Sequence, residues 1–477
     1  MRKANEEKKN ADGAVLGKRA DTKVVKLFQK IAHTVPAYKD FLKKAKIDPT
    51  KIISIAAFKE VPHTSKENYV LKYPLADRVP RGDVSAIKVV ASSSGSTGDP
   101  VFWPRGIAQE RAAHAYHDEI YTENFLMDKK STLAIIAFPF GVYVSGIATA
   151  LPSFAFAQKH KTTIVTAGLN KEGILGVMKE FSPLFRQTLL VGHPFFVKDI
   201  LQSAAKGGLP LKKYHLKLLT CSEGFSEEWR DYMLKIIGSR TPSDIINTYG
   251  SSEFLLIGHE TKETIAIRRR ASRLSSFSVF DTPAVPNLFE FNPETHYVES
   301  QGDALILSAD SGIPLIRYMI GDRGATHDRE SLLRRPGSAA SRNYSRPLVS
   351  LSGRLDHALL FHGINIYPEH FHHAFNSRTV LQFITGRFVL ERVLTKRMDP
   401  FLSITVELNS GIRSSGKIVT LLECLAEKTL RKESIEYRFL REQVKSVLPV
   451  RVFLRSYQDP QYFKPGMKPK YIRQEPI

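Results

Sequence analysis

Apolar and polar positions in the middle of the chain predict an alternation of strands and helices. Short apolar runs are separated by stretches whose apolar residues recur at helical spacing. The strand-like runs are Ser131–Phe138, Thr162–Val165, Thr188–Val191, Leu216–Cys221 and Ile245–Thr248, and the helical stretches are Lys171–Glu180, Phe195–Ala205 and Ser226–Ile237. This order predicts an α/β fold with mixed, largely parallel sheets.

The pattern changes on both sides of this region. Val24–Lys43 is helical but interrupted by Pro36, which predicts two shorter helices. Ser276–Leu307 has the shorter, strand-rich pattern of a β-subdomain, and strands and helices alternate again after Arg354. We therefore expect a flexible charged tail over residues 1–23, a large N-terminal domain over 24–353, and a smaller, mobile α/β lid domain over 354–477.

One uncharged stretch, Ser131–Ala157, has the length of a membrane-spanning helix. Pro139, Gly141, Gly146 and Pro152 divide it into short pieces. A buried strand, a loop and a helix of small residues explain the stretch better, so we expect no membrane span.

Net charge and cysteine content limit the kinds of ligand and the cellular location that we expect. The net charge of +21 over 477 residues attracts anions, but the basic residues are spread along the chain and accompany no nucleic-acid motif. We expect small anionic ligands rather than nucleic acid. Two cysteines, Cys221 and Cys424, do not make a disulfide framework, which favours a cytoplasmic location.

A loop rich in serine and glycine, Ser92–Gly98, follows the strand-like run Ile87–Ala91. Glycines let the backbone turn tightly, and successive N–H groups together with hydroxyls suit a polyphosphate. The loop lacks the Gly-Lys-Ser/Thr ending of a Walker A motif. A plain Ser/Gly linker is the alternative interpretation.

Three later segments carry further candidate chemistry. Asn247–Glu253 lies at the carboxyl end of a predicted strand, where Tyr249 can stack on a purine and Glu253 can bind a hard cation. Gly312–Asp322 ends on an aspartate suited to ribose hydroxyls, and Gly353–Asp356 precedes the segment Phe361–Pro368.

The order of these motifs resembles the adenylate-forming superfamily, and most of all its phenylacetate–CoA ligase and capsule-biosynthesis branch. Near the start, Val35–Phe41 and Val61–Lys66 resemble the same branch. The resemblance implies an AMP-forming acid–thiol ligase: a carboxylic acid is activated by ATP and Mg²⁺ as an acyl-adenylate, and the acyl group then passes to coenzyme A.

The resemblance also implies roles for particular residues. Lys468 would reach from the lid to the α-phosphate, Glu253 would act in catalysis as the Mg²⁺ ligand, and Asp356 would be the hinge. The nucleotide-binding residues would be Ser93, Ser94, Gly95, Ser96, Thr97, Gly98, Ser222, Glu223, Gly224, Tyr249, Gly250, Ser252, Asp322 and Arg354. Phe140, Tyr143 and His193 are candidates for the acid pocket.

Some positions depart from the family pattern. Asp99 stands where many members carry a lysine, and Arg105 is a candidate to compensate. Met467 separates Gly466 from Lys468, which leaves open which C-terminal lysine is catalytic. The basic run Arg268–Arg273 and the histidines of Glu369–His373 are expected to be solvated surface.

Two alternatives to CoA ligation stay open. One is a synthetase that passes the acyl group to a protein or carrier protein, and the other is a nucleotide-binding relative without turnover. The acid and the oligomeric state are not specified by the sequence, although a homodimer is one option.

Overall fold

The structure is a computed structural model of the chain. It describes residues 2–92, 101–274, 279–280, 282, 285–329, 332, 346–355, 358–375, 377–463 and 472–473; within these, the side chains of residues 2–14, 372, 373 and 378 are left out of the description.

One large sheet of eleven strands runs through the molecule. Its strands are β3 (Thr132–Ala137), β4 (Thr162–Val165), β5 (Gln187–Gly192), β6 (Lys217–Thr220), β7 (Ile245–Ser251), β8 (Leu255–His259), β9 (Asn287–Phe291), β10 (Tyr297–Gln301), β11 (Ala304–Ala309), β12 (Leu315–His327) and β13 (Leu348–Arg354). Their order is β10-β11-β12-β13-β9-β8-β7-β6-β5-β3-β4. The sheet is parallel from β7 to β4 and antiparallel from β10 to β7, so the predicted mixed α/β fold is confirmed.

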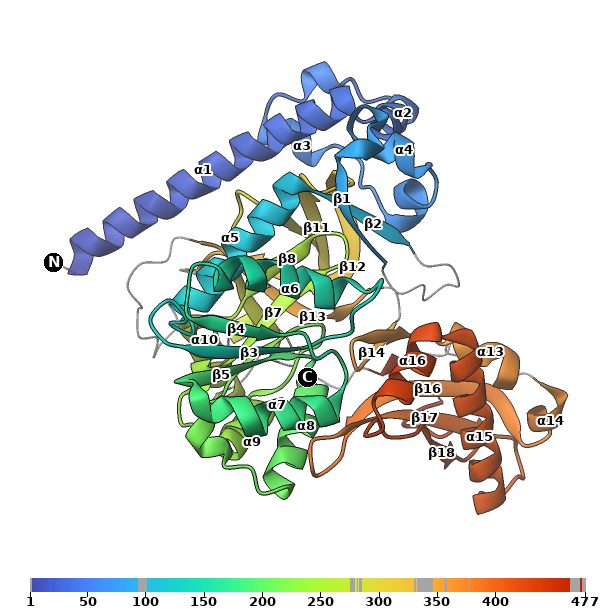
Figure 1. Ribbon diagram of the computed structural model, residues 1–477. Coiled ribbons are helices and arrows are strands. Elements are labelled where there is room, and N and C mark those ends of the chain that lie inside the picture. Colours follow the sequence, from blue (N-terminus) through green and yellow to red (C-terminus); the bar gives the residue numbers. More distant parts are fainter. Residues whose placement is uncertain are drawn as a thin grey trace.

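Helices cover both faces of the parallel strands (Figure 1). They are α5 (Ile107–Glu123), α6 (Val144–Ala157), α7 (Lys171–Phe181), α8 (Pro194–Lys206), α9 (Glu227–Ile237) and α10 (Lys262–Arg273). Strand β3 shows why both faces are covered: Leu133 and Ile135 pack with α7, α8 and α9, while Ala134 and Ile136 pack with α5 and α6. A strand buried on both faces is apolar throughout, which is the signal in Ser131–Phe138.

The antiparallel strands pack against helices from the start of the chain. These are α1 (Arg2–Thr34), α2 (Pro36–Lys44) and α3 (Ile55–Lys59), and α1 ends just before Pro36 as predicted. Val24, Phe28 and Ile31 of α1 share a core with Leu305 and Leu307 of β11. Residues 2–23, expected to be a tail, continue α1, which projects from the body in Figure 1; their flexibility stays a prediction.

A smaller α/β part follows β13. Its four-stranded sheet has the order β18-β17-β16-β19, and a hairpin of β14 and β15 precedes it. The elements are β14 (Leu359–Phe361), β15 (Ile364–Ile366), α13 (Glu369–Phe375), α14 (Arg378–Leu381), β16 (Ile384–Leu394), β17 (Pro400–Leu408), α15 (Gly416–Glu433), α16 (Ile435–Gln443), β18 (Arg451–Arg455) and β19 (Ile472–Arg473). The predicted boundary at 353/354 falls at the end of β13. Separate movement of the two parts stays a prediction.

Short elements complete the described chain. They are η1 (Pro49–Lys51), η2 (Lys66–Val70), α4 (Leu75–Arg78), η3 (Pro80–Gly82), η4 (Val84–Ala86), β1 (Ile87–Ser92), β2 (Phe102–Gly106), η5 (Ser182–Leu184), η6 (Leu211–Tyr214) and η7 (Pro242–Asp244). The uncharged stretch Ser131–Ala157 forms β3, a loop and α6. Within the described ranges, none of the helices has both the length and the apolar character needed to cross a membrane.

Candidate functional site

A cavity of 780 Å³ opens at the carboxyl ends of the parallel strands, between the large sheet and the C-terminal part. Its walls include Thr220 from the end of β6 and Tyr249 from β7. The C-terminal part contributes His362 and Gly363 from the turn between β14 and β15, and Glu436 and Phe439 from α16. Residues far apart in the sequence therefore close one space, at the edge where α/β sheets bind ligands.

Tyr249, Asp322 and Arg354 form one polar wall of the cavity. The Tyr249 hydroxyl donates to Oδ2 of Asp322 at 2.7 Å, and Nη1 of Arg354 donates to Oδ1 at 2.9 Å. Asp322 of β12 is paired directly with Arg354 of β13, which fixes this geometry in the sheet. The three predicted residues are thus brought together, with a carboxylate held between two donors.

Glu253 lies in the turn between β7 and β8 and also lines the cavity. Burial raises the pKa of its carboxyl; nearby Arg354 opposes this shift and Asp322 adds to it. A cation here would favour the ionised form. Among the described residues no group of three or more His, Cys, Asp or Glu side chains could hold a metal ion, but Mg²⁺ is commonly held by one or two carboxylates together with substrate phosphates. Glu253 fits that requirement.

Glycines next to this wall let the backbone approach closely. A Cβ on Gly224 would lie 2.0 Å from Nδ2 of Asn287, and one on Gly250 would lie 2.9 Å from the carbonyl oxygen of Leu255. Ser222, with φ of 76°, and Ser252 line the same cavity. The predicted nucleotide-binding residues of these two turns therefore all border one space.

Glu223 joins the two parts of the molecule. Its side chain is fully buried and lies 2.9 Å from Nε2 of His193. It also pairs with Arg392 of β16 and accepts from the Gly363 amide at 3.2 Å. Burial opposes its ionisation, but the charge of Arg392 and the contact with His193 outweigh burial and hold the pKa at about 2. His193 thus borders the cavity as a partner of Glu223.

Another part of the cavity lining is apolar. Phe138, Val191, Leu219 and Leu256 line it together with Tyr143, whose ring centroid is 5.2 Å from that of Phe439. Phe140 does not line the cavity that the described residues form. It packs instead against Gly146, the nearest ring atoms lying 3.0 Å from where a Cβ would be.

Several predicted positions fall outside the described residues. They are the loop residues Ser93, Ser94, Gly95, Ser96, Thr97 and Gly98, the hinge Asp356 and Lys468. Their roles stay predictions.

Two expectations for charged residues are wrong. Arg105 is buried and lies 3.0 Å from Glu110, so it is engaged away from the cavity. Arg268 and His370, expected on solvated surface, are buried. Arg268 lies on the inward face of α10, where its Nη1 is 2.6 Å from Oε1 of Glu260 in the preceding loop. A basic run gives no sign of which residue faces inward until the helix is placed.

Other residues of the cavity were not predicted. They include His117, Thr149, Asn287, His362, Glu436 and Phe439. Most lie on helix faces or in turns with no distinctive sequence. Apolar residues recur at helical spacing within α5 and within α6. That spacing predicts a helix, but it does not tell which face of the helix meets the sheet.

Known proteins resemble the chain in sequence and in fold. Phenylacetate-coenzyme A ligase from Thermus thermophilus is 20% identical over 361 residues, covering 73% of this chain and 72% of that protein. Phenylacetate-coenzyme A ligase from Aromatoleum evansii is 22% identical over 391 residues, covering 79% and 78%. No family model matches the chain.

A solved structure shares the fold over nearly the whole length. It is a 2-hydroxyisobutyryl-CoA ligase in complex with 2-HIB-AMP and CoA in the thioesterification state, with a TM-score of 0.64 at 17% identity, covering 98% of this chain and 90% of that chain. The relatives, the fold and the order of motifs agree. The chain is therefore similar in sequence to phenylacetate-coenzyme A ligases and shares the fold of the 2-hydroxyisobutyryl-CoA ligase, in agreement with the family that the order of its motifs resembles.

Proposed function

We propose that this protein is an ATP-dependent, AMP-forming acid–thiol ligase. It activates a carboxylic acid as an acyl-adenylate and then passes the acyl group to coenzyme A. The observation that carries the proposal is a single cavity whose lining combines a polar wall of Tyr249, Asp322 and Arg354 with apolar side chains. Such a space suits a nucleotide joined to an acyl group.

The adenylation step brings an anion to a polyanion. A carboxylate oxygen attacks the α-phosphorus of ATP, the new O–P bond forms, and the bond to the bridging oxygen breaks as pyrophosphate leaves. Asp322 and Arg354 would hold the ribose and Tyr249 the adenine, with Ser222, Glu223 and Gly224 as the neighbouring wall. Fixing both reactants removes much of the entropic barrier.

Charge neutralisation would come from several groups. Ser93–Gly98 would hold the β- and γ-phosphates, and Lys468 would contact the α-phosphate. Glu253 would hold Mg²⁺, which lowers the cost of bringing negative charges together. Preorganised charges of this kind contribute most when water is excluded.

Thioester formation would follow in the same cavity. The sulfur attacks the acyl carbon, the bond from that carbon to the AMP oxygen breaks, and the thiol proton is released. Walls from the C-terminal part support this proposal, because β14–β15 and α16 close the cavity on the side away from the sheet. Movement of that part about Asp356 would let successive reactants enter.

The test is ATP–pyrophosphate exchange with a panel of carboxylic acids. We expect acid-dependent exchange, and we expect Lys468→Ala to lower its rate by about 10²- to 10³-fold while ATP binding is retained. Lys464→Ala and Lys470→Ala are matched controls because they lie in the same segment. Loss of exchange in a control instead would move the catalytic role to that lysine.

ATP binding without exchange for any acid would contradict the enzyme proposal and favour the non-catalytic relative. If exchange occurs, adding coenzyme A or a carrier protein identifies the acceptor by the thioester formed. The cytoplasmic location and the homodimer stay predictions of the sequence.

A further inference from the structure

Two polar side chains line the cavity from neighbouring helices. His117 of α5 and Thr149 of α6 are each only 7% exposed. Phe138, Val144 and Leu256 line the same cavity. A polar atom buried in such a place costs free energy unless it has a partner.

Both side chains have already used their hydrogens. Nδ1 of His117 lies 2.9 Å from the Ala113 carbonyl oxygen, so it carries the proton and donates. The Thr149 hydroxyl donates to the Ser145 carbonyl oxygen at 2.9 Å. What remains toward a ligand is acceptor capacity, on Nε2 of His117 and on Oγ1 of Thr149.

The charge state of His117 agrees with this assignment. Burial lowers the pKa of its imidazole to about 4, although the hydrogen bond to Ala113 opposes that shift. The ring is therefore neutral near pH 7, and a neutral ring whose Nδ1 is protonated has an acceptor at Nε2. Across the residues that the structure describes, no partner contacts that atom.

The two acceptors lie at the same level of neighbouring helices. One turn further along, the Tyr121 hydroxyl of α5 is 2.7 Å from Oγ of Ser153 on α6. Both helices pack on the same face of β3, one leading into it and one leaving it, so they run in the same direction. Stepping back four residues on each helix from that hydrogen bond reaches His117 and Thr149.

We propose that the apolar part of the cavity recognises a hydroxyl on the apolar body of the acid, remote from its carboxylate, whose single hydrogen is shared between the two acceptors, Nε2 of His117 and Oγ1 of Thr149. This inference rests on the proposed function for the statement that the acid occupies this part of the cavity. The substrate class is a hydroxylated aryl or alkyl carboxylic acid. An analogue without the hydroxyl would leave a buried acceptor unpaired.

Calorimetric binding of matched acids tests the proposal without requiring turnover. The affinity of the full chain for 4-hydroxyphenylacetate is compared with its affinity for phenylacetate, and its affinity for 6-hydroxyhexanoate with its affinity for hexanoate. In at least one pair we expect the hydroxylated acid to bind about tenfold more tightly. His117→Leu and Thr149→Val should each reduce that preference while retaining binding of the plain acid.

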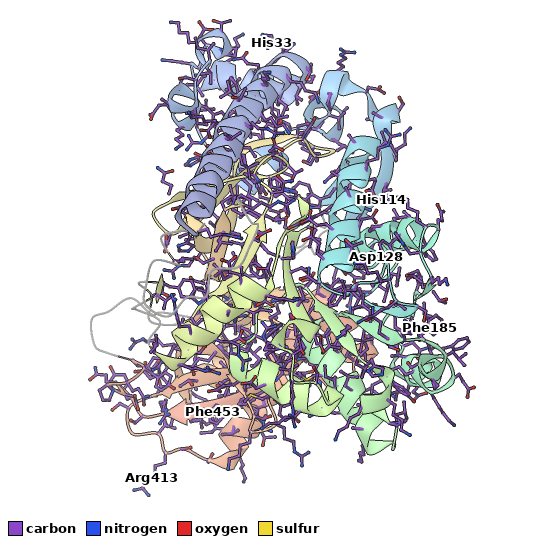
Figure 2. All side chains as sticks on the ribbon, turned by 90° about the vertical axis from the view of Figure 1, so that its left-hand side faces the viewer. His33, His114, Asp128, Phe185, Arg413 and Phe453 are labelled. Atoms are coloured by element: carbon purple, nitrogen blue, oxygen red, sulfur yellow. The ribbon has the colours of Figure 1, made fainter. Side chains whose placement is uncertain are left out.

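His114→Leu is the matched control. His114 is on the same helix (labelled in Figure 2) but is not among the residues lining the cavity, so the preference should persist. Equal binding of the members of both pairs, no binding of either hydroxylated acid, or a preference that survives His117→Leu would overturn the inference. Acid-dependent exchange, measured separately, decides the proposed function.

Discussion

At the scale of single residues, Asp322 is the most constrained member of the polar wall. Tyr249 and Arg354 each occupy one of its oxygens, at 2.7 and 2.9 Å. The carboxylate is thereby held in one orientation in the wall of the cavity. Ordered sugar hydroxyls would meet an acceptor that does not need to reorganise.

Asp322→Asn should lower kcat/KM for ATP in the exchange reaction by roughly 10- to 100-fold. The amide loses one acceptor and the negative charge that Arg354 contacts; hydrogen bonds to charged groups are worth about 1.5–3 kcal/mol. Asp303→Asn is the control. Asp303 is exposed and pairs with Arg323, which follows Asp322 in β12. Equal effects of the two substitutions would remove the ribose role from Asp322.

Sequence motifs predicted Tyr249, Asp322 and Arg354, and the structure brings all three to one wall. The segment of Tyr249 could be placed at the carboxyl end of a predicted strand, whereas Asp322 and Arg354 were predicted from the order of the motifs. His117 and Thr149 could not be predicted in the same way. Their importance depends on which faces of α5 and α6 turn toward β3, and helical spacing alone leaves that open.

At the scale of elements, α16 is a wall of the cavity with an acid in its first turn. Oε2 of Glu436 is buried without a hydrogen-bond partner among the described residues. Burial raises the pKa of its carboxyl to about 7, and Lys66 lowers it. Between pH 4.5 and about 7, the Glu436 carboxyl therefore keeps its proton in the folded protein, whereas the same carboxyl is ionised in the unfolded chain.

Stability should consequently fall as the pH rises through that window and then level off. Glu436→Gln should remove up to about 3 kcal/mol of this dependence, since one pKa unit corresponds to about 1.36 kcal/mol. Urea unfolding at pH 5 and pH 8 measures this dependence. The free energy of unfolding of the variant should exceed that of the wild type at pH 8, and the difference should be much smaller at pH 5. Glu442→Gln, exposed on the same helix, should leave the pH profile unchanged.

Helix α10 contributes a buried charge network. Glu260 accepts from Arg230 at 2.7 Å and from Arg268 at 2.6 Å, and its other oxygen accepts from the Asn247 amide at 2.8 Å. Asn247 lines the cavity and donates to the Glu223 carbonyl oxygen at 3.1 Å. The network thus supports the wall of the site from behind.

Arg268→Met should destabilise the fold by about 3–5 kcal/mol, because it leaves carboxylates buried without one of their partners. Arg273→Met, exposed at the end of the same helix, should change stability by no more than about 0.5 kcal/mol. Chemical denaturation of both variants measures the difference. A small effect at Arg268 would mean that Arg230 alone compensates Glu260.

At the scale of the whole molecule, two ion pairs among the described residues join the C-terminal part to the N-terminal part. Arg392 pairs with Glu223, and the fully buried Lys198 of α8 pairs with Asp399 in the turn between β16 and β17. The apolar runs of the sequence predicted β3, β4, β5 and β6 to within one residue at each end. How the two parts meet could not be predicted, because single charges on separate strands carry no sign of their partners.

Arg392→Gln should loosen the C-terminal part. Glu223 would lose its strongest charged partner, so small-angle scattering should give a larger radius of gyration and protease should cut faster between β13 and β14. Arg397→Gln, exposed in the nearby turn, should do neither. Identical scattering and cleavage for the two variants would mean that Lys198 and the apolar contacts suffice.

Helix α1 has a consequence for how the protein is made. Arg19 contacts Glu294 at a separation of 275 residues, and Lys30 contacts Asp310 at a separation of 280. At roughly 5–20 residues per second, a ribosome needs about a quarter of a minute to a minute to supply those partners. During that interval Val24, Phe28 and Ile31 have their partners in α2 and α3 but lack Leu305 and Leu307 of β11, so the N-terminal helices can complete their core only late in synthesis.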